Sequence, residues 1–90
     1  MRLIIRTSQF KKEFKLMLKR GKSPQKLEEV LEILLFQKNI PQRYYDHKLI
    51  GDYLGSRELH IEADWLLIYC INEHELILER TGTHSDLFKK

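Results

Sequence analysis

The sequence contains one cysteine, Cys70, and lacks the features of an exported or membrane-bound protein. A single thiol can form neither an internal disulfide bond nor a cluster of zinc-binding thiolates. The longest apolar run, residues 65–71, is too short to cross a bilayer, and the N-terminus lacks the apolar run and cleavage site of a signal peptide. We therefore expect a cytoplasmic protein that makes no contact with a membrane.

The short motifs that identify metal, phosphate or serine chemistry are missing as well. No pair of histidines has the HExxH spacing of a helical zinc site, and the chain has neither a GxSxG elbow nor a glycine-rich phosphate loop. The histidines and Asp64 could bind a metal ion only if folding brought them together, and their spacing does not favour this. We expect no metal ion and no cofactor.

The sequence does contain enough apolar residues for one folded domain, and its charges are unevenly distributed. Hydrophobic residues make up 42% of the 90 residues, which indicates a single domain over residues 1–90. Residues 1–26 contain nine Lys or Arg and one acidic residue, whereas the remainder is acidic overall. The basic part suggests a polyanionic partner, nucleic acid above all, although a solvated lysine-rich helix would have the same composition.

Hydrophobic periodicity predicts a short strand followed by two helices. Residues 3–5 form a β-rich run, and Thr7 or Ser8 can cap a first helix that ends at Gly21. A second helix begins at Ser23-Pro24, with an apolar stripe that reaches residue 35. The first helix has apolar side chains on one face (Phe10, Phe14, Met17, Leu18) and lysines on the other (Lys11, Lys12, Lys15, Lys19, Lys22).

The second half of the chain predicts a loop and a meander of strands. Residues 39–55 have no sustained periodicity, and so long a loop in a small domain is usually functional or mobile. Residues 56–62, 65–71 and 75–80 predict strands separated by turns, and a final helical turn ends at Phe88. The order β-α-α-β-β-β predicts an α+β fold, with two N-terminal helices on one face of a small antiparallel sheet.

The chain contains the residue types that a metal-free ribonuclease needs. One group must take the proton of the attacking ribose 2′-hydroxyl and another must protonate the departing 5′-oxygen, and histidine suits both roles. Asp64 could act as a base or orient an imidazole, Arg80 could neutralise the phosphate, and Phe88 or Trp65 could stack on an unpaired base. The candidate histidines are His47, His60 and His84.

Several of these candidates also have simpler structural explanations. Strand alternation places His60 with Glu58 and Glu62 on a solvent-exposed face, which could be no more than a charged surface. Trp65 opens an apolar strand and suits the core equally well. Arg80 could form an ion pair with a neighbouring carboxylate, Glu79 or Asp86. The residue types alone therefore leave the choice open.

Order and spacing in the second half of the chain add a further argument. The segments Asp46-His47-Lys48-Leu49, Arg57-Glu58-Leu59-His60-Ile61 and Asp64-Trp65-Leu66-Leu67-Ile68-Tyr69 precede an ending of the form Arg-x-Gly-[Ser/Thr]-His-x-x-Leu-Phe at residues 80–88. Together with the basic helical hairpin before them, these segments resemble the YafQ-type branch of the RelE/ParE toxin superfamily. The ending is the most specific part, and the resemblance covers nearly the whole chain.

The resemblance implies a toxin of a type II toxin–antitoxin pair with a RelE-like, microbial-ribonuclease-like fold. Such a toxin enters the ribosomal A site, next to ribosomal RNA, and cuts mRNA there without a metal ion. A cognate antitoxin neutralises it, and the toxin contacts operator DNA only through the toxin–antitoxin complex.

The resemblance also implies roles for individual residues. His84 matches the main catalytic histidine, proposed as the general acid, and His60 and Asp64 match residues proposed for proton transfer and phosphate contact. The other matched positions are the loop histidine His47, a basic residue near the phosphate at Arg80, and aromatic residues at Phe88 and Trp65. The one departure is Ala63, where the family commonly has a proline before the aspartate.

Two questions remain open from the sequence. The same fold is found in ParE-type toxins, which inhibit gyrase without nuclease chemistry, although the histidines of this chain favour the nuclease. The lysines of the first helix could bind ribosomal RNA, or they could face an acidic segment of the antitoxin.

Overall fold

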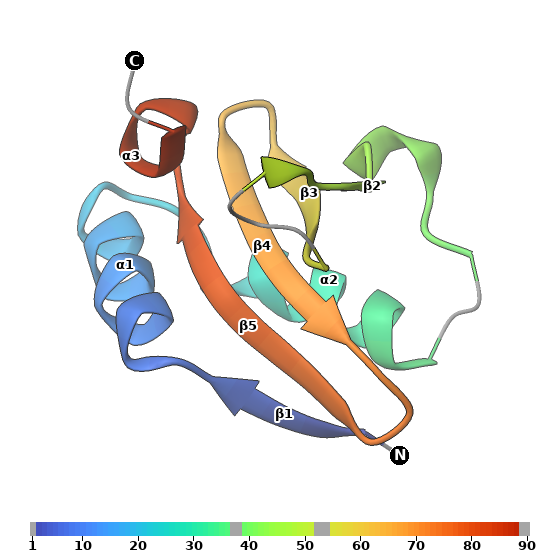
Figure 1. The fold of residues 1–90 in the computed structure, drawn as a ribbon. Coiled ribbons are helices and arrows are strands. Elements are labelled where there is room, and N and C mark those ends of the chain that lie inside the picture. The colour runs from blue at the N-terminus through green and yellow to red at the C-terminus, as the bar shows by residue number, and fades with distance from the viewer. Residues whose placement is uncertain (1, 37–38, 52–54, 89–90) are drawn as a thin grey trace.

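The structure is a computed structural model and describes residues 2–36, 39–51 and 55–88. It has five strands, three α-helices and one short 3₁₀ helix over these residues (Figure 1). In chain order these are β1 (Leu3–Arg6), α1 (Ser8–Lys19), α2 (Pro24–Phe36), η1 (Gln42–Tyr44), β2 (His47–Lys48), β3 (Arg57–Glu62), β4 (Trp65–Ile71), β5 (Glu75–Gly82) and α3 (His84–Phe88). No described helix has the length and apolar character that spanning a membrane requires.

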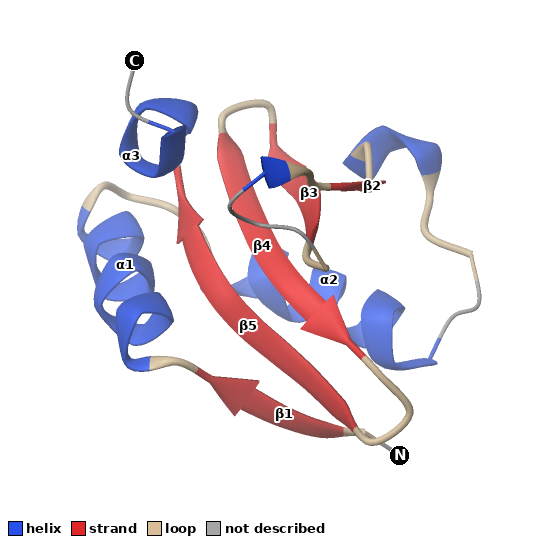
Figure 2. Ribbon diagram, in the orientation of Figure 1, coloured by secondary structure: helices blue, strands red, loops and turns tan. Residues whose placement is uncertain are grey.

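The strands form one sheet in the order β1-β5-β4-β3-β2 (Figure 2). Strands β3, β4 and β5 are antiparallel neighbours, which confirms the predicted meander, while β2 adds an antiparallel strand within residues that were expected to form a loop. The expectation of a purely antiparallel sheet is wrong for β1, which pairs in parallel with β5. The helical hairpin α1–α2 follows β1 at one edge of the sheet, and the chain then reaches β2 at the opposite edge. The α+β class with two N-terminal helices is confirmed.

The interior has two parts, one on each face of β4. The larger part lies between the helices and the sheet and includes Phe10, Met17, Val30, Trp65 and Leu78. The smaller part contains Leu66, Ile68 and Leu87, with Leu49 and Phe88 packed against it. Because alternate side chains of a strand point to opposite faces, β4 is buried on both sides, as its continuous apolar run predicted. Leu18, which was expected on the apolar face of α1, is 39% exposed.

Helix α1 begins and ends with contacts that tie it to the sheet and to α3. The hydroxyl of Thr7 accepts a hydrogen bond from the Phe10 N–H at 2.9 Å and donates one to the Glu79 carbonyl at 2.8 Å. After α1, the Arg20 guanidinium lies 2.6 Å from the Asp86 carboxylate. The start of α3 is therefore attached to the end of α1.

A capping box fixes the first turn of α3. The Asp86 carboxylate accepts a hydrogen bond from the Thr83 N–H at 3.0 Å, and the Thr83 hydroxyl accepts one from the Asp86 N–H at 3.1 Å. These contacts hold His84, the first residue of α3, in a defined place at the end of β5.

The Asp86 contacts predict a specific loss of stability in acid. The hydrogen bond from Arg20, and after it the Thr83 N–H, lowers the pKa of Asp86 from 3.8 to about 2. Because the folded-state pKa is lowered, this stabilisation is present above the ordinary pKa and is lost as pH falls toward about 2. Asp86→Asn should cost about 1 kcal/mol at neutral pH. Thermal unfolding from pH 6 down to acid should show a smaller acid loss in the variant, and identical pH dependence would contradict the assignment.

Candidate active site

Three histidines that are far apart in the sequence lie together in the structure. His47 is on β2, His60 is on β3 and His84 begins α3. The ring centroids of His47 and His60 are 6.4 Å apart, and those of His60 and His84 are 5.5 Å apart. Folding thus brings the three candidate histidines together, and we call this group the histidine cluster.

Asp64 holds one end of the histidine cluster. It lies in the turn between β3 and β4, and its Oδ1 is 2.6 Å from the Nδ1 of His84 and 2.9 Å from the His84 backbone nitrogen. The backbone N–H of His84, followed by the imidazole, lowers the pKa of Asp64 below 3.8. Since a carboxylate can only accept a hydrogen bond, Nδ1 of His84 carries the proton. The other ring nitrogen, Nε2, has no contact with Asp64 and can exchange a proton with a substrate.

Glu58 lies between the other two histidines, and its role was missed from the sequence. Its Oε1 is 3.3 Å from Nε2 of His47 and 3.6 Å from Nε2 of His60. The strand pattern predicted an exposed face here, whereas Glu58 is only 5% exposed because β2 pairs across it, with His47 opposite Glu58. A buried carboxylate is stabilised by nearby positive charge, which the two imidazoles supply when they are protonated.

Asp46, which directly precedes β2, is anchored to the sheet by hydrogen bonds with residues of β3 and β4. The Asp46 carboxylate accepts hydrogen bonds from the Arg57 guanidinium and from the Tyr69 hydroxyl. Burial, reinforced by Asp46, raises the pKa of Tyr69, so its hydroxyl stays a donor. The residues on either side of Asp46, which are Tyr45 and His47, are thereby fixed relative to the sheet.

Tyr45 is a second residue that the sequence argument did not select. Its carbonyl lies 2.8 Å from Nδ1 of His47. Its ring makes edge contacts with His60 at 5.6 Å and with His47 at 6.0 Å between centroids, yet the residue is 69% exposed. Its location in a loop without periodicity gave only a general signal of function.

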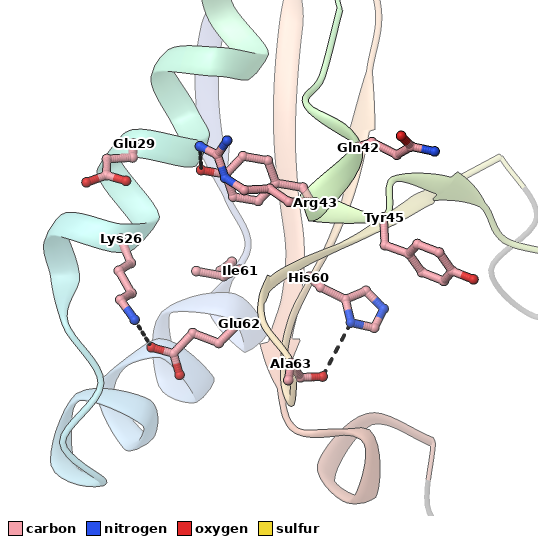
Figure 3. Close-up of a pocket in the computed structure, with 10 residues that line it drawn as sticks. Lys26, Glu29, Gln42, Arg43, Tyr45, His60, Ile61, Glu62 and Ala63 are labelled. Atoms are coloured by element: carbon pink, nitrogen blue, oxygen red, sulfur yellow. Dashed lines mark hydrogen bonds and ion pairs between the residues drawn. The ribbon is translucent and has the colours of Figure 1, made fainter.

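A pocket of about 700 Å³ opens beside His60 (Figure 3). It extends between α2, η1 and the end of β3. Lys26 and Glu62 line it and form an ion pair of 2.6 Å, while Arg43 and Tyr45 come from η1 and the residue that follows it. The histidine cluster therefore borders a hollow large enough for part of a nucleotide.

The three predicted substrate-binding residues occupy different environments. Trp65 is completely buried and donates from Nε1 to the Thr81 hydroxyl at 2.8 Å, so the expectation that it stacks on RNA is corrected to a role in the core. Arg80 forms an ion pair with Glu13 on α1 rather than with Glu79 or Asp86. Phe88 packs, partly buried, against the smaller core. No direct RNA contact is evident for Trp65, and those of Arg80 and Phe88 stay predictions.

Within the described ranges, no three side chains of His, Cys, Asp or Glu form a group that could hold a metal ion. The carboxylates of the site instead lie against imidazole nitrogens, as described above for Asp64 and Glu58.

Comparison with known proteins places this fold and site in a defined class. Residues 2–89 match the family model described as "Bacterial toxin of type II toxin-antitoxin system, YafQ". The mRNA interferase toxin YafQ of Escherichia coli K12 is 41% identical over 83 residues, which are 91% of this chain and 90% of that protein.

Solved structures agree with this match. The crystal structure of the E. coli DinJ-YafQ complex contains a chain with a TM-score of 0.90 and 40% identity, covering 98% of this chain and 99% of that one. The crystal structure of a metal-bound toxin from Helicobacter pylori has a TM-score of 0.90 and 36% identity, covering 98% and 100%. The class is thus that of bacterial toxins of type II toxin–antitoxin systems. Within it, this chain belongs to the YafQ family.

The Asp64–His84 contact makes a prediction for NMR in acid. Because His84 lowers the pKa of Asp64, the backbone amide signal of His84 should titrate with a midpoint below 3.8. Two-dimensional ¹H–¹⁵N spectra recorded over a pH series measure this midpoint. In Asp64→Asn the acid transition should vanish from the His84 amide. A midpoint at or above 3.8 would show that the contact is not maintained in solution.

Proposed function

We propose that this protein is a ribosome-dependent mRNA endonuclease that cuts in the A site by metal-free acid–base catalysis. The observation that carries the proposal is the histidine cluster, in which a carboxylate lies against one nitrogen of each imidazole. The name of the E. coli relative, mRNA interferase toxin, supports the same activity.

The proposed reaction begins with the ribose 2′-hydroxyl, which attacks the adjacent phosphorus as a base removes its proton. We assign the base to His60. In the neutral ring Nδ1 carries the proton, because it lies 3.4 Å from the Ala63 carbonyl, an oxygen that can only accept a hydrogen bond. Nε2 therefore keeps its lone pair and is the nitrogen that takes the proton, 3.6 Å from Oε1 of Glu58. The imidazolium that forms is stabilised by Glu58.

His84 acts at the other end of the reaction as the general acid. With Nδ1 directed at Asp64, the proton on Nε2 of the imidazolium is delivered to the departing 5′-oxygen. The P–O bond to the 5′-oxygen breaks, which leaves a 2′,3′-cyclic phosphate on one fragment and a 5′-hydroxyl on the other. Asp64 keeps the ring in the orientation that makes Nε2 the transferring atom.

His47 adds positive charge beside the phosphate when it is protonated. Its Nδ1 faces the Tyr45 carbonyl at 2.8 Å and its Nε2 faces Glu58 at 3.3 Å, so the protonated ring can donate to both oxygens. An imidazolium in this place would offset the charge that develops on the phosphorus oxygens. Arg80 remains a second proposed phosphate contact, although Glu13 already binds its guanidinium.

We further propose that the exposed lysines of α1 bind ribosomal RNA and that a cognate antitoxin neutralises the toxin. Lys11, Lys12, Lys15 and Lys19 are all exposed on this helix. Affinity that depends on such lysines would fall steeply as salt concentration rises. The E. coli relative was crystallised as the DinJ-YafQ toxin-antitoxin complex, which supports an antitoxin partner. We propose that operator DNA is contacted only through a complex of this kind.

His84→Ala tests the assignment of the general acid. The variant should lose growth inhibition, with kcat lowered by about 10² to 10⁴, because no other group is held at the departing oxygen. Circular dichroism should show a native fold, since the His84 side chain is exposed and outside the core. Mapping mRNA 5′ ends after induction measures cleavage and separates it from gyrase poisoning, which would give DNA damage without codon-phased cuts. Full toxicity of the alanine variant would refute the assignment.

Glu58→Gln tests the base side of the reaction. The amide keeps the size of the carboxylate but cannot stabilise an imidazolium, so kcat should fall about 10- to 100-fold and the acid limb of the pH–rate profile should move. Glu75→Gln is a matched control, because Glu75 is also a strand carboxylate but begins β5 at its end remote from α3 (Figure 1). Equal rates for both variants and the unmodified protein would exclude Glu58 from the mechanism.

A further inference from the structure

Tyr45 combines two features that its packing does not explain. It is 69% exposed, although a tyrosine in a small domain ordinarily buries much of its ring. Its φ of 53° makes it the one described residue other than glycine in the left-handed region, which a bulky side chain rarely adopts. Such backbone strain persists where the surrounding structure imposes it and is concentrated at functional sites.

The surroundings of Tyr45 show how this conformation is imposed. It follows η1, and its N–H bonds to the Gln42 carbonyl at 3.0 Å. On its other side, Asp46 is held by Arg57 and Tyr69. Between these anchors the left-handed turn presents the Tyr45 ring beside His60, where the two rings meet edge to face at an interplanar angle of 89° and most of the Tyr45 side chain stays exposed.

We propose that Tyr45 stacks on a base of the mRNA next to the scissile linkage. This inference rests on the proposed mRNA cleavage and assigns the ring to the nucleotide on the His47 side of the histidine cluster. His60 lies between Tyr45 and His84, with ring centroids 5.6 Å and 5.5 Å away. Suppose that the ribose-phosphate linkage to be cut is held between His60 and His84. Tyr45 then lies within one nucleotide of this linkage, on the side away from His84.

The pocket beside the ring is suited to the backbone of the same nucleotide. Arg43 lies over the Tyr44 ring at 4.7 Å and donates to the Tyr44 hydroxyl at 3.2 Å, which holds its guanidinium at the pocket wall (Figure 3). Among the residues that the structure describes, no carboxylate is paired with Arg43. A guanidinium so placed can bind a phosphate, while the exposed ring of Tyr45 offers an aromatic face to the base.

The left-handed backbone of Tyr45 allows a matched pair of variants. Tyr45→Asn removes the ring but tolerates the left-handed conformation, and it keeps the carbonyl that faces His47. Tyr45→Phe keeps the ring and removes the hydroxyl. Stacking predicts that Tyr45→Asn loses about 5- to 100-fold in kcat/KM, mainly through KM, and that Tyr45→Phe stays within about threefold. Cleavage of a defined mRNA on purified, programmed ribosomes measures both constants.

A fluorescence measurement separates stacking from a purely structural role. The probe is an mRNA with 2-aminopurine next to a 2′-O-methylated, uncleavable linkage, bound in the A site. The unmodified protein and Tyr45→Phe should quench this fluorophore, whereas Tyr45→Asn should not. Normal cleavage and quenching by Tyr45→Asn would overturn the inference, and so would equal losses in both variants, since they would implicate the hydroxyl.

His84→Ala distinguishes failure of this inference from failure of the proposed function. This variant should quench 2-aminopurine as the unmodified protein does, while it cleaves the natural linkage slowly. If His84→Ala cleaves at the normal rate, the catalytic assignment is wrong, and the quenching by the Tyr45 variants still decides the stacking question. If His84→Ala is inactive and Tyr45→Asn is fully active, only the stacking inference is refuted.

Discussion

One oxygen atom joins the two parts of the chain on which the active site depends. Oδ1 of Asp64 faces both the backbone N–H and the ring Nδ1 of His84, at 2.9 Å and 2.6 Å. Asp64 belongs to the β3–β4 turn and His84 to α3, so this contact closes a gap of twenty residues in sequence. An exposed histidine at the start of a short helix would otherwise sample several rotamers, and catalysis needs a defined one.

The contacts between carboxylates and imidazoles also reduce the electrostatic repulsion that RNA would meet at this site. RNA phosphates are repelled by carboxylates, yet Glu58, Asp64 and Asp46 all lie in or beside the histidine cluster. Each is placed against groups that can donate hydrogen bonds: two imidazoles at Glu58, His84 at Asp64, and Arg57 with Tyr69 at Asp46. The carboxylates thus orient the rings while presenting little uncompensated negative charge to the substrate.

The local pattern of the sequence was enough to predict the two helices, the three long strands and the candidate histidines. It could not show which strands pair, and this is where the expectations failed. The parallel placement of β1 beside β5 is a long-range contact that periodicity does not encode. Glu58 was expected on an exposed face, because an alternating pattern cannot reveal that the two-residue strand β2 covers it. Trp65 fitted the core and the RNA site equally well until its burial was known.

The proposed substrate recognition and the proposed chemistry share a very short segment around Tyr45 and His47. The ring of Tyr45 is exposed and makes a T-shaped contact with His60, its carbonyl lies against Nδ1 of His47, and β2 begins two residues later. A base that stacks on this ring would therefore bind the same residue whose carbonyl orients His47. Because Asp46 is hydrogen-bonded to Arg57 and Tyr69, the turn at Tyr45 can keep its conformation when a base is bound. A strained left-handed residue is an effective device here, since it directs a side chain outward and a carbonyl inward from a single position.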